Sequence, residues 1–160
     1  MTGIKLICVG RLKEAHYIRA CDELLQRLGR YCRIDVIEVD DEKSPEKLSA
    51  AQREQVRQRE GRAVLSKLCE GEYFIATDIG GVQLDSMSFA QRLDKLAAHG
   101  ESRIAIAVGG SLGLSAEVLD RAALRLSFSP MTFNHRLFRL MLLEQLYRAH
   151  RINRGEPYHK

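Results

Sequence analysis

The fold of this chain is decided by the stretch Arg103-Ile-Ala-Ile-Ala-Val108, which leads directly into Gly109-Gly110-Ser-Leu-Gly113. The first part is almost entirely apolar, as expected for a central strand of a parallel sheet that helices cover on both faces. The glycines end the strand and allow the backbone to turn tightly or to approach a ligand closely. The stretch predicts an α/β protein, and it leaves open whether the glycine loop binds a ligand or is a plain turn.

Strand and helix patterns alternate on both sides of this stretch. Short apolar or alternating runs predict strands over residues 4–9, 33–39, 73–77, 103–108 and 125–128. Helical spacing predicts helices over residues 17–28, 44–68, 88–99, 116–122 and 136–152. This order indicates one α/β domain over residues 1–160, because no linker or repeat interrupts it.

Capping residues mark where three of the helices are expected to begin. Ser44 precedes Pro45, which suits the first turn of a helix. Ser88 and Gln91 have the spacing of a capping box, and Ser115 precedes the short helix.

Composition is that of a globular protein without a membrane span. The 160 residues are 45% hydrophobic and 29% charged, and no apolar run approaches the roughly 20 residues that a membrane helix needs. The four cysteines lack the spacing of a zinc site or a disulfide framework. The N-terminus has no basic leader and no cleavage site. We therefore expect a cytoplasmic protein with no metal and no membrane partner.

Positive charge is concentrated at the C-terminal end. Residues 121–160 hold eight Lys and Arg against two Asp and Glu, whereas the first 120 residues hold 17 against 19. Three of the five histidines also lie in this last quarter. The asymmetry favours a polyanionic partner, nucleic acid first, and the alternative is a solvated basic face.

Two further C-terminal features point to a site and to a partner. The segment from Phe128 to Phe133 follows a strand, and its apolar and hydroxyl side chains suit the second half of a pocket. The alternative is a plain loop with aromatic side chains that face the core. The expected helix over 136–152 is apolar around most of its circumference, which calls for burial on two sides. A second copy of the chain would provide the second side, unless the helix is central in a monomer.

Four motifs resemble those of the RlmH family, the bacterial large-subunit rRNA pseudouridine N3-methyltransferases of the SPOUT class. They are Ala107-Val-Gly-Gly-Ser-Leu-Gly113, Leu126-Ser-Phe-Ser-Pro-Met-Thr-Phe-Asn-His135, Glu144-Gln-Leu-Tyr-Arg148 and Pro157-Tyr-His-Lys160. The resemblance implies a parallel-sheet SPOUT methyltransferase fold with a C-terminal deep trefoil knot, and a homodimer. It also implies S-adenosyl-L-methionine as methyl donor and, as substrate, a loop pseudouridine of 23S rRNA in assembled ribosomes.

The resemblance assigns cofactor-binding residues position by position. They are Thr77, Gly109, Phe128, Ser129, Pro130, Met131, Thr132 and Phe133. Thr77 stands where leucine is common in the family, and Asn134 stands where proline usually precedes the histidine.

Methylation at N3 requires that the N3 proton leave, so a base near neutral pKa would assist. His159, with the phenol of Tyr158, is the first candidate for this catalytic role, and His135 is the second. Arg139 and Arg154 are assigned to phosphate or to developing negative charge.

Three other functions stay open at this point. A flavodoxin-like binding module would use the same sheet and glycine loop without chemistry. A noncatalytic ribosome-binding factor would need only the basic C-terminus. A knotted enzyme that modifies tRNA is the nearest alternative, and the Tyr-His ending favours the rRNA family over it.

Overall fold

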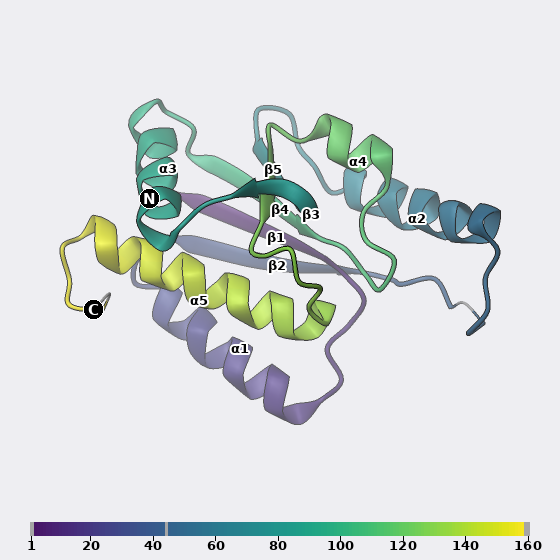
Figure 1. The fold of residues 1–160 in the computed structure, drawn as a ribbon. Coiled ribbons are helices and arrows are strands. Elements are labelled where there is room, and N and C mark those ends of the chain that lie inside the picture. The colour runs from purple at the N-terminus through teal and green to yellow at the C-terminus, as the bar shows by residue number, and fades with distance from the viewer. Residues whose placement is uncertain (1, 44, 159–160) are drawn as a thin grey trace.

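A five-stranded parallel sheet forms the middle layer of the protein (Figure 1). The computed structural model describes residues 2–43 and 45–158. The strands lie in the order β2-β1-β4-β3-β5. Their bounds are β1 Gly3–Val9, β2 Arg33–Val39, β3 Tyr73–Gln83, β4 Arg103–Val108 and β5 Leu124–Ser127. The expected α/β parallel sheet is therefore confirmed, with the stretch over 103–108 at its centre.

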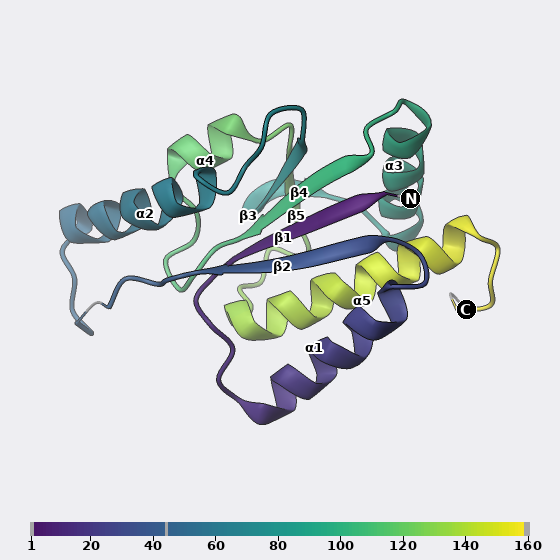
Figure 2. The same cartoon turned by 180° about the vertical axis from the view of Figure 1, so that it is seen from behind.

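Helices cover both faces of this sheet, as Figures 1 and 2 show from opposite sides. One face carries α1 (Ala15–Leu28), α3 (Ser86–Ala98) and α5 (His135–Asn153). The other face carries α2 (Ala50–Leu65) and α4 (Ala116–Arg121).

Each face of the sheet has its own hydrophobic core. In β1, Ile4 and Leu6 belong to the core beneath α1, α3 and α5, while Ile7 and Val9 belong to the core beneath α2 and α4. This alternation follows from the period of two in a strand, and all four side chains are buried. On the α2 and α4 side, β4 contributes the small side chains Ala105 and Ala107, and larger ones come from the neighbouring strands, such as Phe74 of β3.

Two helices begin at residues other than those predicted. Helix α2 begins after Ser49, whose hydroxyl accepts from Gln52 N–H at 3.2 Å while the Gln52 side chain accepts from Ser49 N–H at 2.8 Å. The predicted helix start at Ser44 and Pro45 is wrong, because Pro45 precedes the helix. Ser44 itself lies outside the described residues. The later capping box satisfies two backbone donors at once, which a single serine cannot do.

Helix α3 begins earlier than Ser88. The Asp85 carboxylate accepts from Ser88 N–H at 2.7 Å and caps the helix, so Ser88 already lies in the first turn. A carboxylate at this position also interacts favourably with the positive end of the helix dipole, which a serine hydroxyl does less well.

Strand β3 is longer than predicted and irregular. Thr77 and Val82 both pair with Leu126 of β5, so residues 78–81 bulge out of the ladder. Gly81 is required here, because a Cβ on it would lie 2.6 Å from the Arg125 carbonyl oxygen. The strand therefore continues through Gly80 and Gly81, beyond the predicted end at residue 77. Strand β5 also lies one residue earlier than the predicted 125–128.

Helix α5 is packed between α1 and α3. Its fully buried apolar side chains are Leu142, Leu143, Leu146, Tyr147 and Ala149. Much of its broad apolar surface is thus covered within one chain, as the central-helix alternative proposed. The side chains near its start remain half-buried, namely Leu137, Phe138, Leu140 and Met141.

Candidate functional site

The three segments assigned to the cofactor converge at the carboxyl edge of the sheet. Gly109 follows β4, Thr77 lies in β3, and residues 128–133 follow β5. These three strands are neighbours in the order β4-β3-β5. The carboxyl ends of parallel strands are where open α/β sheets bind their ligands, so the topology places these segments in a suitable position.

The glycine loop folds tightly back on itself. Gly110 and Gly113 form an isolated antiparallel bridge, and Gly113 has a φ of +78°. A Cβ on Gly109 would lie 2.9 Å from the Gly113 carbonyl carbon. The loop shape therefore depends on the absence of a side chain at Gly109.

Thr77 joins two of the converging strands. Its hydroxyl donates to the Ala107 carbonyl oxygen at 3.0 Å, just before the glycine loop begins. The bulge of β3 starts directly after Thr77. A threonine here therefore has a structural partner, which a leucine at this position would lack.

The loop over residues 128–133 is held at its start and exposed at its tip. Phe128 lies against Phe138 of α5, with ring centroids 4.6 Å apart. Ser127 donates to the Ser129 carbonyl oxygen at 3.2 Å, and the Ser129 hydroxyl accepts from Met131 N–H at 3.0 Å. Met131 is 73% exposed.

An apolar pocket of about 790 Å³ lies beside this loop. Its lining side chains are Leu24, Leu84, Asp85, Ser86, Phe89, Leu126, Phe128, Phe133, Leu140, Met141, Glu144 and Gln145. Of the residues assigned to the cofactor, Phe128 and Phe133 line this pocket, while Thr77, Gly109 and residues 129–132 lie outside its lining. The pocket is closed largely by α1, α3 and α5.

The C-terminal tail returns to the rim of this pocket. The Tyr158 phenol donates to Glu144 Oε1 at 3.2 Å, and its ring meets Tyr147 edge-on with centroids 5.0 Å apart. Arg148 pairs with the same Glu144 oxygen at 2.7 Å and lies over the Tyr158 ring. Burial and the neighbouring Glu144 raise the pKa of Tyr158. His159 lies outside the described residues, so its position relative to Tyr158 stays a prediction.

His135 lies at the start of α5 beside the end of β1. A Cβ on Gly10 would lie 3.8 Å from His135 Nε2 and 3.7 Å from the Asp41 carboxylate carbon, so both side chains border Gly10. Burial lowers the pKa of His135, and the cations Arg136 and Arg139 lower it further. The imidazole is therefore neutral near pH 7 and can accept a proton.

The assignment of Arg139 to phosphate requires a correction. Its side chain is buried, Nη1 pairs with Glu38 Oε1 at 2.5 Å, and Nη2 donates to the Gly10 carbonyl oxygen at 2.8 Å. A guanidinium held in this way joins α5 to the ends of β1 and β2 and is not presented to a polyanion. The sequence could not show this, because Glu38 and Arg139 are 101 residues apart.

Arg154 lies at the opposite end of the molecule from His135. It follows the last residue of α5, a helix of 19 residues that spans about 28 Å. Its guanidinium carbon lies 4.6 Å from the centroid of the Tyr31 ring. Within one chain, Arg154 and His135 therefore cannot act on the same reacting atom.

One buried acid near the glycine loop was not singled out from the sequence. Glu60 is 6% exposed, and its Oε1 accepts from Glu42 N–H at 3.0 Å. Its Oε2 has no hydrogen-bond partner among the described residues and lies 3.5 Å from where a Cβ on Gly110 would be. Burial raises the pKa of Glu60. Its only signal in the sequence is the Arg59-Glu-Gly61 motif, which also fits the RlmH family.

A comparison with protein families decides the identity of this fold. Residues 2–159 match the family described as predicted SPOUT methyltransferase. The chain belongs to the SPOUT methyltransferase family. The resemblance seen in the sequence is thereby confirmed.

Individual relatives of this SPOUT family member agree with the assignment. It is 49% identical to a Clostridioides difficile protein and 51% identical to a Bacillus cytotoxicus protein, in each case over 158 residues and 99% of both chains. Both relatives are named ribosomal RNA large subunit methyltransferase H. A solved structure of a probable methylase family protein from Haemophilus influenzae Rd KW20 matches with a TM-score of 0.56. That match is 14% identical and covers 98% of this chain and 70% of the other, so it shows the fold alone.

Two searches of the described residues bear on metals and membranes. Among residues 2–43 and 45–158, no group of three or more His, Cys, Asp or Glu side chains is placed to hold a metal ion. Within the same residues, none of the helices is both long and apolar enough to cross a membrane.

Proposed function

We propose that this SPOUT family member transfers a methyl group from S-adenosyl-L-methionine to N3 of a loop pseudouridine in large-subunit rRNA. The observation that carries the proposal is the convergence of the glycine loop, Thr77 and the loop over 128–133 at one edge of the sheet. Relatives of about 50% identity named as large-subunit rRNA methyltransferases support the RNA substrate.

The residues at this edge fit a sulfonium donor. S-adenosyl-L-methionine supplies a methyl group on a positively charged sulfur. Phe128 and Phe133 offer aromatic walls, whose faces attract a cation. The glycine loop allows backbone to approach the ligand closely, because no side chain intervenes at Gly109. We assign Thr77, Gly109 and residues 128–133 to holding the donor.

The tail of the chain handles the proton in this proposal. N3 loses its proton as it is methylated, so a base beside N3 lowers the barrier. We assign this role to His159, with Tyr158 oriented by its hydrogen bond to Glu144. His135 is the second candidate, since its pKa is lowered and it begins the helix that follows the 128–133 loop.

We further propose that the active form is a homodimer with a knotted C-terminal region. Exposed apolar side chains support an additional partner surface near the pocket: Met131 is 73% exposed, Ile79 55% and Val82 54%. The half-buried apolar residues at the start of α5 adjoin this region. Sedimentation equilibrium would test the dimer, and a monomer at micromolar concentration would overturn it.

Assembled ribosomes are the expected substrate. The basic C-terminal quarter provides charge for contacts to phosphate, while the net charge of +4 is modest for binding naked RNA. We therefore expect ribosome binding to weaken steeply with added salt. A flat response to salt would contradict docking through phosphates.

The decisive experiment measures labelled methyl transfer to ribosomes that lack the modification. Free 23S rRNA and tRNA serve as alternative substrates, and mass spectrometry locates the modified base. Label at N3 of one loop pseudouridine, lost in a Tyr158→Phe, His159→Ala variant, supports the proposal and the role of the tail. Ribosome binding without transfer would leave a noncatalytic binding factor, and label on tRNA would assign a different substrate.

A further inference from the structure

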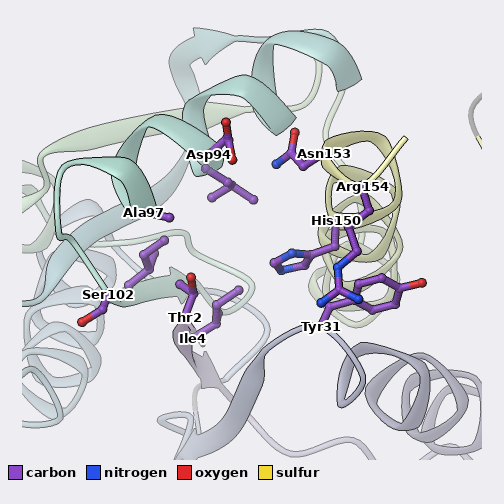
Figure 3. A pocket seen from close by; sticks show the side chains of 11 residues that line it. Thr2, Ile4, Tyr31, Asp94, Ala97, Ser102, His150, Asn153 and Arg154 are labelled. Atoms are coloured by element: carbon purple, nitrogen blue, oxygen red, sulfur yellow. The ribbon is translucent and has the colours of Figure 1, made fainter. Parts of the chain in front are cut away.

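A second pocket lies at the amino edge of the sheet, at the far end of α5 from the glycine loop. Figure 3 shows the His150 imidazole pointing from α5 into this pocket, with Asp94 and Asn153 on one side and Thr2 and Ile4 on the other. Its volume is about 380 Å³. The start of α5, beside the glycine loop, is about 28 Å away. Glu144 of the apolar pocket is only six residues before His150, but the two pockets share no lining residue.

One wall of the pocket consists of planar groups held in place. The Tyr31 hydroxyl donates to Glu156 Oε2 at 2.6 Å, and the Tyr31 ring meets Tyr147 edge-on. His150 stacks with Tyr31 at a centroid distance of 5.9 Å and an interplanar angle of 21°. The Arg154 guanidinium lies 4.6 Å from the centroid of the Tyr31 ring. These planes are fixed before any ligand arrives, which reduces the entropy lost on binding.

Some polar groups of the pocket have hydrogen-bonding capacity that no described residue fills. His150 Nε2 is buried and has no hydrogen-bond partner among the described residues. Burial lowers the pKa of His150, with Arg154 lowering it further, so the imidazole is neutral near pH 7 and can offer one donor and one acceptor. Asn153 Nδ2 donates to the Ala90 carbonyl oxygen at 2.9 Å, which fixes the amide group. The exposed Asp94 carboxylate adds an acceptor.

The remaining surface of the pocket is apolar. Ile4, Leu93 and Ile104 line it and are buried members of the core beneath α1, α3 and α5. The pocket therefore combines apolar contact, an aromatic stack, acceptors and one exposed cation. An inorganic anion would interact favourably only with the Arg154 cation, and the Asp94 carboxylate would repel it.

We propose that this pocket binds a single nucleotide, with its base against the apolar floor and His150 and its phosphate at Arg154. A base can both stack and hydrogen-bond, and stacking on aromatic or arginine planes is how unpaired RNA bases are commonly held. The volume lies near the small end of the roughly 300–1,000 Å³ that ligand pockets span, which suits one nucleotide. The nucleotide comes from an unpaired RNA strand or is free in solution. The RNA source rests on the proposed function, whereas binding of a free nucleotide does not.

The test measures binding of UMP and of a short oligouridylate by calorimetry, without S-adenosyl-L-methionine. Arg154→Gln removes the exposed cation, and Arg121→Gln on α4 removes the same charge from the opposite face of the sheet. We expect Arg154→Gln to weaken binding about tenfold, the usual loss for a hydrogen bond to a charged group. Arg121→Gln is expected to leave binding within about twofold, because Arg121 lies on the opposite face of the sheet and does not line the pocket. An iodouridine-substituted oligonucleotide is expected to cross-link to Tyr31 or His150.

The outcomes separate this inference from the proposed function. Binding of both probes with cross-links at these two residues supports an RNA nucleotide, and binding of UMP alone supports a free nucleotide. Absence of binding, equal weakening by the two arginine variants, or cross-links only at the carboxyl edge would overturn the pocket assignment. Methyl transfer that persists in such a case leaves the proposed function intact. Nucleotide binding without methyl transfer would support the pocket assignment and contradict the proposed methyltransferase activity.

Discussion

The two ends of α5 carry the same residue types in opposite situations. At its start, Arg139 is 4% exposed and its guanidinium is bound to Glu38 and to the Gly10 carbonyl. Just past its end, Arg154 is exposed, and its guanidinium carbon lies 4.6 Å from the centroid of the Tyr31 ring. Whether an arginine can contact a polyanion therefore depends on how many of its five donors are already satisfied within the chain.

The histidines at the two ends differ in a related way. His135 borders Gly10 and Asp41 at the carboxyl edge, close to the glycine loop. His150 stacks on Tyr31 at the amino edge, and its Nε2 is buried without a partner among the described residues. The carboxyl edge thus carries residues that we assign to the donor and the reaction, while the amino edge retains unused hydrogen-bonding capacity.

The strongest test of this comparison removes the buried cation. Arg139→Met leaves Glu38 without its cationic partner and should lower the free energy of unfolding by about 3 kcal/mol. This is the low end of the range for a broken buried pair, because the Glu38 side chain is 32% exposed. Arg154→Gln should change the same quantity by less than about 0.5 kcal/mol. Urea unfolding measures both, and equal losses would show that the two arginines do not differ as described.

A second substitution tests whether methyl transfer depends on the carboxyl edge of the sheet and not on the amino edge. Gly109→Ala places a Cβ 2.9 Å from the Gly113 backbone, so the glycine loop must move. A displacement of about 1 Å can reduce turnover about hundredfold, and we expect a loss of methyl transfer of this order. Nucleotide binding at the amino edge should be unchanged.

The matched control for that variant is Gly29→Ala. Gly29 has a φ of −56°, and its nearest new contact would be at 3.4 Å, so the methyl group fits. It should retain methyl transfer. If the two alanine variants were equally active, the glycine loop would not position the donor.

A smaller effect is expected at the tail. Tyr158→Phe removes the hydrogen bond to Glu144 and should lower the free energy of unfolding by about 1 kcal/mol. Tyr17→Phe removes the same atom from a tyrosine whose ring contacts His16 at a tilt of 42°, and it should leave stability nearly unchanged. Urea unfolding of both variants is the measurement. A loss confined to Tyr17→Phe would place the tail elsewhere in solution.

The smallest expected effect depends on pH. Because burial lowers the pKa of His150 below its usual value of about 6.5, the unfolded chain binds a proton more readily than the folded one. The stability contributed by neutral His150 is present above about pH 6.5 and is lost as the pH falls through its lower folded pKa. As the pH falls from 8 to 5.5, His150→Gln should therefore lose less stability than the parent protein does. Parallel stability curves would contradict the neutral, buried state of His150.

Sequence reasoning succeeded where neighbouring residues decide the outcome. The apolar run over 103–108 became β4 with the predicted bounds, and Ser115 caps α4 as expected. It failed at the starts of α2 and α3, where several residues compete to cap one helix. Ser49 and Asp85 provide better partners for the first-turn donors than Ser44 or Ser88.

For the candidate site, the sequence named segments that the topology brings together at one edge of the sheet, but it did not show how their side chains are arranged. Phe128 and Phe133 line the apolar pocket as expected, whereas the walls from α1 and α3 had no signal in the motifs. Glu60 was overlooked because an acid on a highly charged helix is usually solvated, and its burial results from the close approach of α2 to the glycine loop.

By itself, the sequence determined the alternating α/β order, the central strand and the family, because periodicity and motifs are properties of adjacent residues. The tertiary structure alone decided that Arg139 is a structural cation and that the amino edge holds a pocket. The partners responsible are far apart in the chain: Arg139 and Glu38 are separated by 101 residues, and Tyr31 and Glu156 by 125. Such pairs form only when the sheet brings distant segments together, and no local pattern records them.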